Sequence, residues 1–164
     1  LDIEADTDVD RLFEQYIKNE MADEKKILIF LVDDDALYLK SLEIEFTQNT
    51  KSYIRTYATG ELCIENLSQN PDIIILDYHL DSVDKTAMNG LDTLYQIKIA
   101  YPQIPVIMLS SQDKIEVAVN CMKQQAFDYI VKTETAFIRL QKAITTIFHY
   151  QKIEKALNWY MEKM

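Results

Sequence analysis

The feature that most constrains this chain is a strict alternation of short apolar runs and helical segments from about residue 27 onward. Each apolar run has the length of a buried strand, and five are expected, at 29–32, 52–57, 73–76, 106–109 and 129–131. Helical patterns follow them, from residue 36, near 59–61, at 91–101, at 115–124 and from about 135. Strands that are apolar on both faces and separated by helices indicate a parallel sheet covered on both sides. The sequence therefore predicts a doubly wound α/β fold in three layers.

Charge and apolar content exclude several classes of protein. The net charge is −10, and residues 1–24 hold nine acidic and two basic residues, a net of −7. Since no basic stripe is present, we expect no direct binding to nucleic acid. No apolar run approaches the roughly 18 residues of a membrane span, and no secretory signal is recognisable, which favours the cytoplasm. Cys63 and Cys121 lack metal-ligand spacing and are expected to be small buried side chains.

Both ends of the chain extend beyond the alternating region. We expect residues 1–6 to be disordered and Thr7 to cap an amphipathic helix within an acidic extension, 1–24. One domain should span 26–148, and the last helix, from about 136 to 164, should continue past it as a second extension, 149–164. Its apolar residues fall into two sets, a sheet-docking face (Phe137, Leu140, Ile144, Ile147) and a continuation (Ile153, Leu157, Tyr160, Met164). The continuation predicts a contact with a second chain, with the N-terminal helix, or with an output domain.

Chemically distinctive residues follow four of the predicted strands. Asp33-Asp34-Asp35 follows the first strand, Asp77 the third, Ser110-Ser111 the fourth and Lys132 the fifth. Because the carboxyl ends of parallel strands meet at one edge of the sheet, we expect these groups to lie together. Clustered carboxylates are tolerable around a hard divalent cation such as Mg²⁺, and a lysine and a hydroxyl can hold phosphoryl oxygens. The combination favours phosphoryl transfer to an aspartate.

At these positions the sequence resembles the receiver domains of two-component response regulators, of the chemotaxis-regulator type. The segments that carry the resemblance are FLVDDD, PDIIILDYHL, PVIMLSS and FDYIVK. The resemblance implies a flavodoxin-like (βα)5 fold with strand order 2-1-3-4-5. It also implies a bacterial signalling switch, in which Asp77 accepts a phosphoryl group from a sensor histidine kinase or a histidine phosphotransfer protein. A separate substrate turnover is not expected, and the output partner is left open.

The resemblance further implies a role for each matching residue. Mg²⁺, which Mn²⁺ could replace, would be held by Asp33, Asp34, Asp77 and the main-chain carbonyl of His79. Ser110 would be the switch hydroxyl, Lys132 would contact the phosphoryl group and Tyr129 would be the rotating aromatic. The side chains of His79 and Gln112 stand at positions that tune dephosphorylation. Asp35 would lie outside the metal shell and begin the following helix.

The sequence departs from the family pattern after three of the predicted strands. Thr133 stands where the family commonly has a proline in a cis bond; a cis bond before a non-proline residue costs about 2.5–4 kcal/mol, so a trans bond is expected. The loop between Asp77 and Gly90 is longer by about five residues than in typical members, a length that loop entropy tolerates. The switch position is Ser110 rather than threonine, which keeps the hydroxyl and loses a methyl group.

Two alternatives remain open at this point. Asp33 and Asp35 also fit the D-x-D motif of haloacid-dehalogenase-type phosphatases, although a later acidic pair is missing and Asp77 would have no role. The second alternative is an interaction module with the same fold that is never phosphorylated, which Thr133 and the long loop would suit. A homodimer through the last helix is compatible with either reading.

Overall fold

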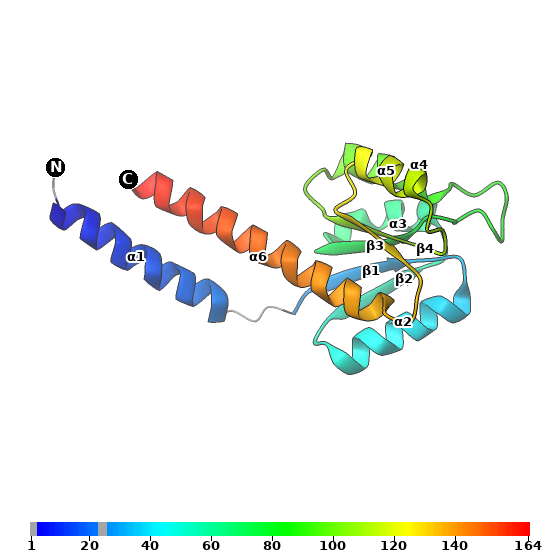
Figure 1. Cartoon of the computed structure of the whole chain (residues 1–164), viewed down its shortest axis with the longest axis horizontal. Coiled ribbons are helices and arrows are strands. Elements are labelled where there is room, and N and C mark those ends of the chain that lie inside the picture. Colours follow the sequence, from blue (N-terminus) through cyan, green and yellow to red (C-terminus); the bar gives the residue numbers. More distant parts are fainter. Residues whose placement is uncertain (1–2, 23–25) are drawn as a thin grey trace. The chain divides into compact units, whose positions relative to one another are not determined.

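The protein, seen in a computed structural model that describes residues 3–22 and 26–164, contains one parallel sheet. Its strands lie in the order β2-β1-β3-β4-β5 (Figure 1). Their bounds are β1 (Leu28–Val32), β2 (Tyr53–Tyr57), β3 (Ile73–Asp77), β4 (Val106–Ser110) and β5 (Asp128–Val131). Every neighbouring pair is parallel. The predicted doubly wound fold and strand order are therefore confirmed.

Helices cover both faces of this sheet. They are α2 (Ala36–Asn49), α3 (Gly60–Glu65) with the 3₁₀ turn η1 (Leu67–Gln69), α4 (Gly90–Ala100), α5 (Ile115–Lys123) and α6 (Ala136–Lys163). In Figure 1, α3, α4 and α5 lie on one face, whereas α2 lies on the other beside the start of α6. Phe46 of α2 and Phe137 of α6 meet edge to face, with ring centroids 5.0 Å apart. The helices begin within a residue or two of the predicted positions.

Buried side chains of the three central strands form the core. Phe30, Ile74, Val106 and Met108 point to the same side of the sheet and are completely buried. They form one cluster with Cys63, Leu67, Leu94 and Ile97 from the helical layer. Since each fully buried side chain of this size contributes about 1.5–3 kcal/mol, the central strands are fixed in register by their burial. The strand ends, where polar residues begin, are held in place by this core.

The connection from β3 to α4 occupies residues 78–89, and its two ends are joined at the base. The Gly90 N–H donates a hydrogen bond of 2.9 Å to the carbonyl of Tyr78. A Cβ atom on Gly90 would stand 2.2 Å from the carbonyl oxygen of Asp77 and 2.6 Å from the Cα of Tyr78. Only glycine fits this close approach of two backbone segments. The start of α4 is thus pressed against the end of β3.

The chain divides into two compact units, one spanning Lys26–Ala143 and one that combines α1 (Ile3–Ala22) with Ile144–Met164. Inside the second unit, Phe13 and Tyr16 stack on Trp159, and the Tyr160 hydroxyl donates to Asp10 at 3.2 Å. A contact between the last helix and the N-terminal helix, one of the three that were predicted, is therefore present.

The N-terminal helix of this second unit begins earlier than expected. The helix begins at Ile3 rather than after Thr7, so the prediction of a cap at Thr7 and that of disorder over residues 3–6 were wrong, while residues 1–2 lie outside the described part of the chain. In the apolar continuation of the last helix, Ile153 is 49% exposed and Leu157 52%.

Two smaller expectations, on the cysteines and on the bond before Thr133, are met. Cys63 and Cys121 are free and buried. No cis peptide bond occurs in 3–22 or 26–164, so the bond before Thr133 is trans. None of the helices in those ranges is both long and apolar enough to cross a membrane.

Candidate functional site

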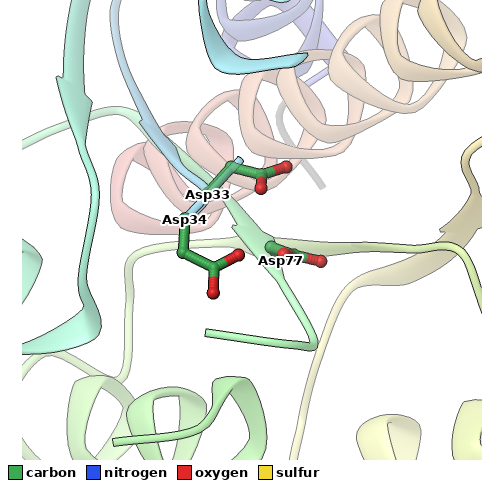
Figure 2. Close-up of side chains that lie close together, drawn as sticks. All are labelled: Asp33, Asp34 and Asp77. Carbon is green, nitrogen blue, oxygen red and sulfur yellow. The ribbon is translucent and has the colours of Figure 1, made fainter. Parts of the chain in front are cut away.

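Three aspartates meet at the carboxyl edge of the sheet. Asp33 and Asp34 follow β1 directly, and Asp77 is the last residue of β3 (Figure 2). One carboxylate oxygen of each lies within 4.8 Å of the others. Asp33 and Asp77 are each only 4% exposed, whereas Asp34 is half-buried. The two strands, which are neighbours in the sheet, bring together the carboxylates that the sequence analysis singled out.

Lys132 places its ammonium group among these carboxylates. It follows β5, and its Nζ lies 2.7 Å from Oδ2 of Asp33 and 3.4 Å from Oδ1 of Asp77. Burial lowers the pKa of this lysine, but the hydrogen bond and attraction of Asp33 and the charge of Asp77 outweigh it, so the pKa lies above its ordinary value. Lys132 is therefore a positive charge at the site, available to a further anionic group.

The charge around Asp77 is not fully balanced by this lysine. Burial, followed by repulsion from Asp33, raises the pKa of Asp77 to about 7, against the opposing effects of Lys132 and of the His79 backbone N–H. The charged form of a buried carboxylate with a raised pKa is stabilised by any further positive charge placed beside it. Three converging carboxylate oxygens are also the ligand type that Mg²⁺ prefers. The residues present thus fit the divalent cation that was expected at this edge.

Asp34 is bound by backbone groups of the long loop that joins β3 to α4. Its Oδ2 accepts hydrogen bonds from the backbone N–H groups of Ser82, at 2.9 Å, and Val83, at 3.2 Å. Farther along the loop, the Met88 N–H donates to the carboxylate of Glu61, 3.1 Å away at the start of α3. Sequence reasoning found neither contact, because both link residues far apart in the chain through loop backbone, which has no residue signature.

Asp35 takes the position that was expected of it. Its side chain caps α2 by accepting hydrogen bonds from the N–H groups of Leu37 and Tyr38, and its own N–H donates to Oδ1 of Asp33 at 2.9 Å. The phosphatase alternative requires Asp33 and Asp35 side by side as reacting groups. With Asp35 turned into its helix cap and Asp33 paired to Lys132, the geometry does not favour that alternative.

The expected switch residues lie on the neighbouring strands β4 and β5. Ser110 is completely buried, and its Oγ accepts a hydrogen bond of 3.1 Å from the Gln112 N–H. The Tyr129 hydroxyl donates a 2.5 Å hydrogen bond to the Gln112 carbonyl. Gln112 therefore links the hydroxyl and the aromatic residue through its backbone. His79 is half-buried two residues beyond Asp77, with its ring edge to face against Tyr78.

Sequence reasoning missed one side chain at the site, Tyr38. Its ring lies beneath the Lys132 ammonium, with Nζ 4.4 Å from the ring centroid. Burial raises the pKa of the phenol, while the charge of Lys132 acts in the opposite direction. A signal did exist, since an aromatic residue in the first turn after an acidic triplet must lie near the same sheet edge.

Comparison with solved structures agrees with the observed fold. A signal receiver domain of a putative LuxO repressor protein from Vibrio parahaemolyticus superposes with a TM-score of 0.69 at 22% identity, covering 81% of this chain and 98% of that one. The BeF3-activated receiver domain of DrrB gives a TM-score of 0.62 at 23% identity, covering 74% and 99%. At these identities the likeness concerns the fold alone.

Sequence comparison identifies the family. The DNA-binding transcriptional regulator NtrC of Escherichia coli K12 is 30% identical over 135 residues, and the Vibrio cholerae regulatory protein LuxO 31% over 96, which cover 80% and 58% of this chain. The chain spans only 27% and 18% of those relatives' lengths. The response regulator receiver domain pattern matches residues 29–145. This chain therefore belongs to the receiver domain family of two-component response regulators.

Proposed function

We propose that the chain is a phosphorylation-dependent signalling switch whose phosphoacceptor is Asp77. Its phosphodonor would be a sensor histidine kinase or a histidine phosphotransfer protein. The observation that carries the proposal is the contact of buried Asp77 with Lys132, at 3.4 Å, beside two further carboxylates. A nucleophilic oxygen, a fixed cation and a set of metal ligands are the parts that phosphoryl transfer requires. Family membership supports the same assignment.

Mg²⁺ would be held by Asp33, Asp34 and Asp77, with the main-chain carbonyl of His79 as a further ligand, and Mn²⁺ could take its place. When bound, the ion would neutralise the charge that spreads over the phosphoryl oxygens during transfer. The fit rests on three carboxylate oxygens within 4.8 Å of one another. It also rests on the raised pKa of Asp77, which marks uncompensated negative charge.

The residues of the chain divide the chemistry of transfer among them. A carboxylate oxygen of Asp77 attacks the phosphorus of a phosphohistidine, so a P–O bond forms while the P–N bond to the imidazole breaks. Lys132 exchanges part of its contact with Asp77 for a phosphoryl oxygen, as its pairing with Asp33 keeps it in place. The Ser110 hydroxyl donates to another phosphoryl oxygen. Water later hydrolyses the acyl phosphate, with His79 and Gln112 as the residues that tune its rate.

The response would spread from Ser110 to the surface that a partner reads. As Ser110 moves toward the phosphoryl group, its hydrogen bond from the Gln112 N–H is strained, and Gln112 also accepts from Tyr129. Tyr129 then turns inward and changes the surface formed by α5, β5 and the first part of α6. The output partner would recognise this surface. The switch would act in the cytoplasm, without contacting nucleic acid or membrane itself and without turning over a separate substrate.

A homodimer through the last helix is proposed on separate grounds. Ile153, Leu157 and Met164 are 49%, 52% and 82% exposed and recur at helical spacing. Sedimentation equilibrium of the whole chain should show self-association that Leu157→Gln weakens. Ile138→Gln is the matched control, because Ile138 is as exposed (56%) on another part of the same helix. A chain that stays monomeric at all concentrations would contradict the dimer and leave the switch unaffected.

The switch itself is tested by direct phosphorylation. Incubation with Mg²⁺ and acetyl phosphate should add the mass of one phosphoryl group, and Asp77→Asn should prevent it. Asp72→Asn is the matched control, because Asp72 is an exposed carboxylate that precedes β3, at the opposite edge of the sheet, and hydrogen-bonds the Leu28 N–H. A mass gain that persists in Asp77→Asn, or a wild type that never gains it, would refute the proposal.

A further inference from the structure

Lys132 is held on three sides, of which only two are carboxylates. Asp33 and Asp77 lie 2.7 and 3.4 Å from its Nζ. The third side is the face of the Tyr38 ring, with a centroid 4.4 Å away. A lysine side chain has four rotatable bonds and a strongly hydrated head, so it loses considerable freedom when its ammonium is fixed at one point. The ring occupies space from which water would otherwise draw the ammonium out of the site.

Tyr38 is itself fixed by the residues beside it in sequence. It lies in the first turn of α2, and its N–H donates a 3.2 Å hydrogen bond to the side chain of Asp35. The Asp35 N–H in turn donates to Oδ1 of Asp33. The backbone from which the ring projects is thus tied to the same carboxylate that pairs with Lys132. A continuous series of contacts runs from Asp33 through Asp35 and Tyr38 to the lysine and back to Asp33.

We propose that Tyr38 is a positioning residue for phosphoryl transfer, acting through its aromatic face on Lys132. The face attracts a cation, and this attraction grows when both groups are partly withdrawn from water, as they are here. Asp33 alone would fix one N–H of the ammonium, whereas the ring and Asp33 together fix its direction. The lysine then stands ready for a phosphoryl oxygen on Asp77. This role rests on the proposed function and deepens it.

The hydroxyl of Tyr38 has no part in the proposed role, which makes the test selective. Tyr38→Phe keeps the ring and removes only the oxygen. Tyr38→Met keeps a similar apolar volume in a good helix former and removes the aromatic face, and Tyr38→Leu provides a second variant of that kind. The matched control is Tyr53→Met, because Tyr53 makes the same type of contact with Lys26, at 4.1 Å, but lies at the start of β2, away from the carboxyl edge.

Two measurements on the whole chain separate the outcomes. In the first, performed without phosphodonor, NMR records the ε-methylene proton resonances of Lys132, which the ring current of Tyr38 should shift upfield. The shift should remain in Tyr38→Phe and Tyr53→Met and disappear in Tyr38→Met and Tyr38→Leu. In the second, the initial rate of phosphorylation by acetyl phosphate with Mg²⁺ is measured. It should fall by about threefold to thirtyfold in Tyr38→Met and Tyr38→Leu, and by less than about twofold in Tyr38→Phe and Tyr53→Met.

Several results would overturn the inference. Equal rates in wild type, Tyr38→Met and Tyr38→Leu would show that the ring does not position the lysine for transfer. A loss of rate in Tyr38→Phe as large as that in Tyr38→Met would assign the effect to the hydroxyl instead. If wild type gains no phosphoryl group, the proposed function itself fails, whereas a wild type that reacts alongside unaffected ring variants refutes only the role of Tyr38.

Discussion

Replacing Asp77 with asparagine should stabilise the metal-free protein at neutral and alkaline pH. The pKa of Asp77 is raised to about 7, from an ordinary value of 3.8, chiefly by burial and by repulsion from Asp33. Between these values the folded protein keeps a proton that the unfolded chain has released. The free energy of unfolding therefore falls as pH rises through this window, and the cost is fully present above about pH 7. Asparagine has no charge to bury and avoids the cost.

The size of the effect follows from the two pKa values. One pKa unit corresponds to about 1.4 kcal/mol, so the rise from 3.8 to about 7 amounts to a ceiling of about 4 kcal/mol. This figure already contains the attraction of Lys132, which acts against the rise. Local rearrangement and water entry relieve part of the cost. We therefore expect Asp77→Asn to raise the free energy of unfolding by about 2 to 4 kcal/mol at about pH 8.

Urea unfolding in the presence of a chelator measures this difference. Wild type and Asp77→Asn should be most similar at about pH 4 and diverge steadily up to about pH 8. Asp72→Asn, an exposed change at the other edge of the sheet, should follow the wild-type curve. Added Mg²⁺ should then stabilise wild type more than Asp77→Asn, because only wild type has the third carboxylate. Parallel curves would show that the attraction of Lys132 balances burial and repulsion, and a variant less stable than wild type at about pH 8 would show that the attraction outweighs them.

Further substitutions test other parts of the site. Gly90→Ala should lower the free energy of unfolding by about 1 to 3 kcal/mol in urea, because its Cβ would stand 2.2 Å from the Asp77 carbonyl; an unchanged midpoint would contradict that contact. Asp35→Ala should cost about 1 kcal/mol by removing the α2 cap, with Asp35→Asn near wild type. Glu61→Ala should speed hydrogen exchange of the Met88 amide, because the Glu61 carboxylate accepts a hydrogen bond from it, while Asn89 still caps α4. An unchanged exchange rate would contradict a stabilising role for this hydrogen bond.

The layout of the fold was predictable because two periodic signals coincide in this chain. Apolar runs such as 73–76, which are buried on both faces, are typical of a parallel sheet covered by helices, and here they alternate with helical segments. Asp77 and Lys132 follow two such runs, so their meeting at one edge came from topology alone. Boundaries were less certain at the N-terminus, where α1 begins at Ile3, because acidic residues in a first turn suit both a solvated tail and a helix start.

Contacts that depend on loop geometry could not be predicted. The hydrogen bonds from Ser82 and Val83 to Asp34 come from backbone N–H groups, which every residue except proline offers equally. The position of Tyr38 in the first turn of α2 indicates the correct sheet edge, but the contact of its ring with Lys132 depends on how α2 leaves the sheet, which the Asp35 cap decides. A pattern of residue types identified the charged groups, whereas the groups that hold them in position depend on three-dimensional detail.

The hydrogen bond between Gly90 and Tyr78 also has a consequence for how this chain can change. It closes residues 78–90 into a loop. The closing hydrogen bond, 2.9 Å from nitrogen to oxygen, lies next to the end of β3. Residues inserted between Tyr78 and Gly90 lengthen the loop without changing the hydrogen bond that closes it. The segment around Asp84 and Lys85 can therefore vary in length and composition while Asp77 and the first turn of α4 keep their spacing. A long loop and an unchanged geometry around Asp77 are compatible in one chain for this reason.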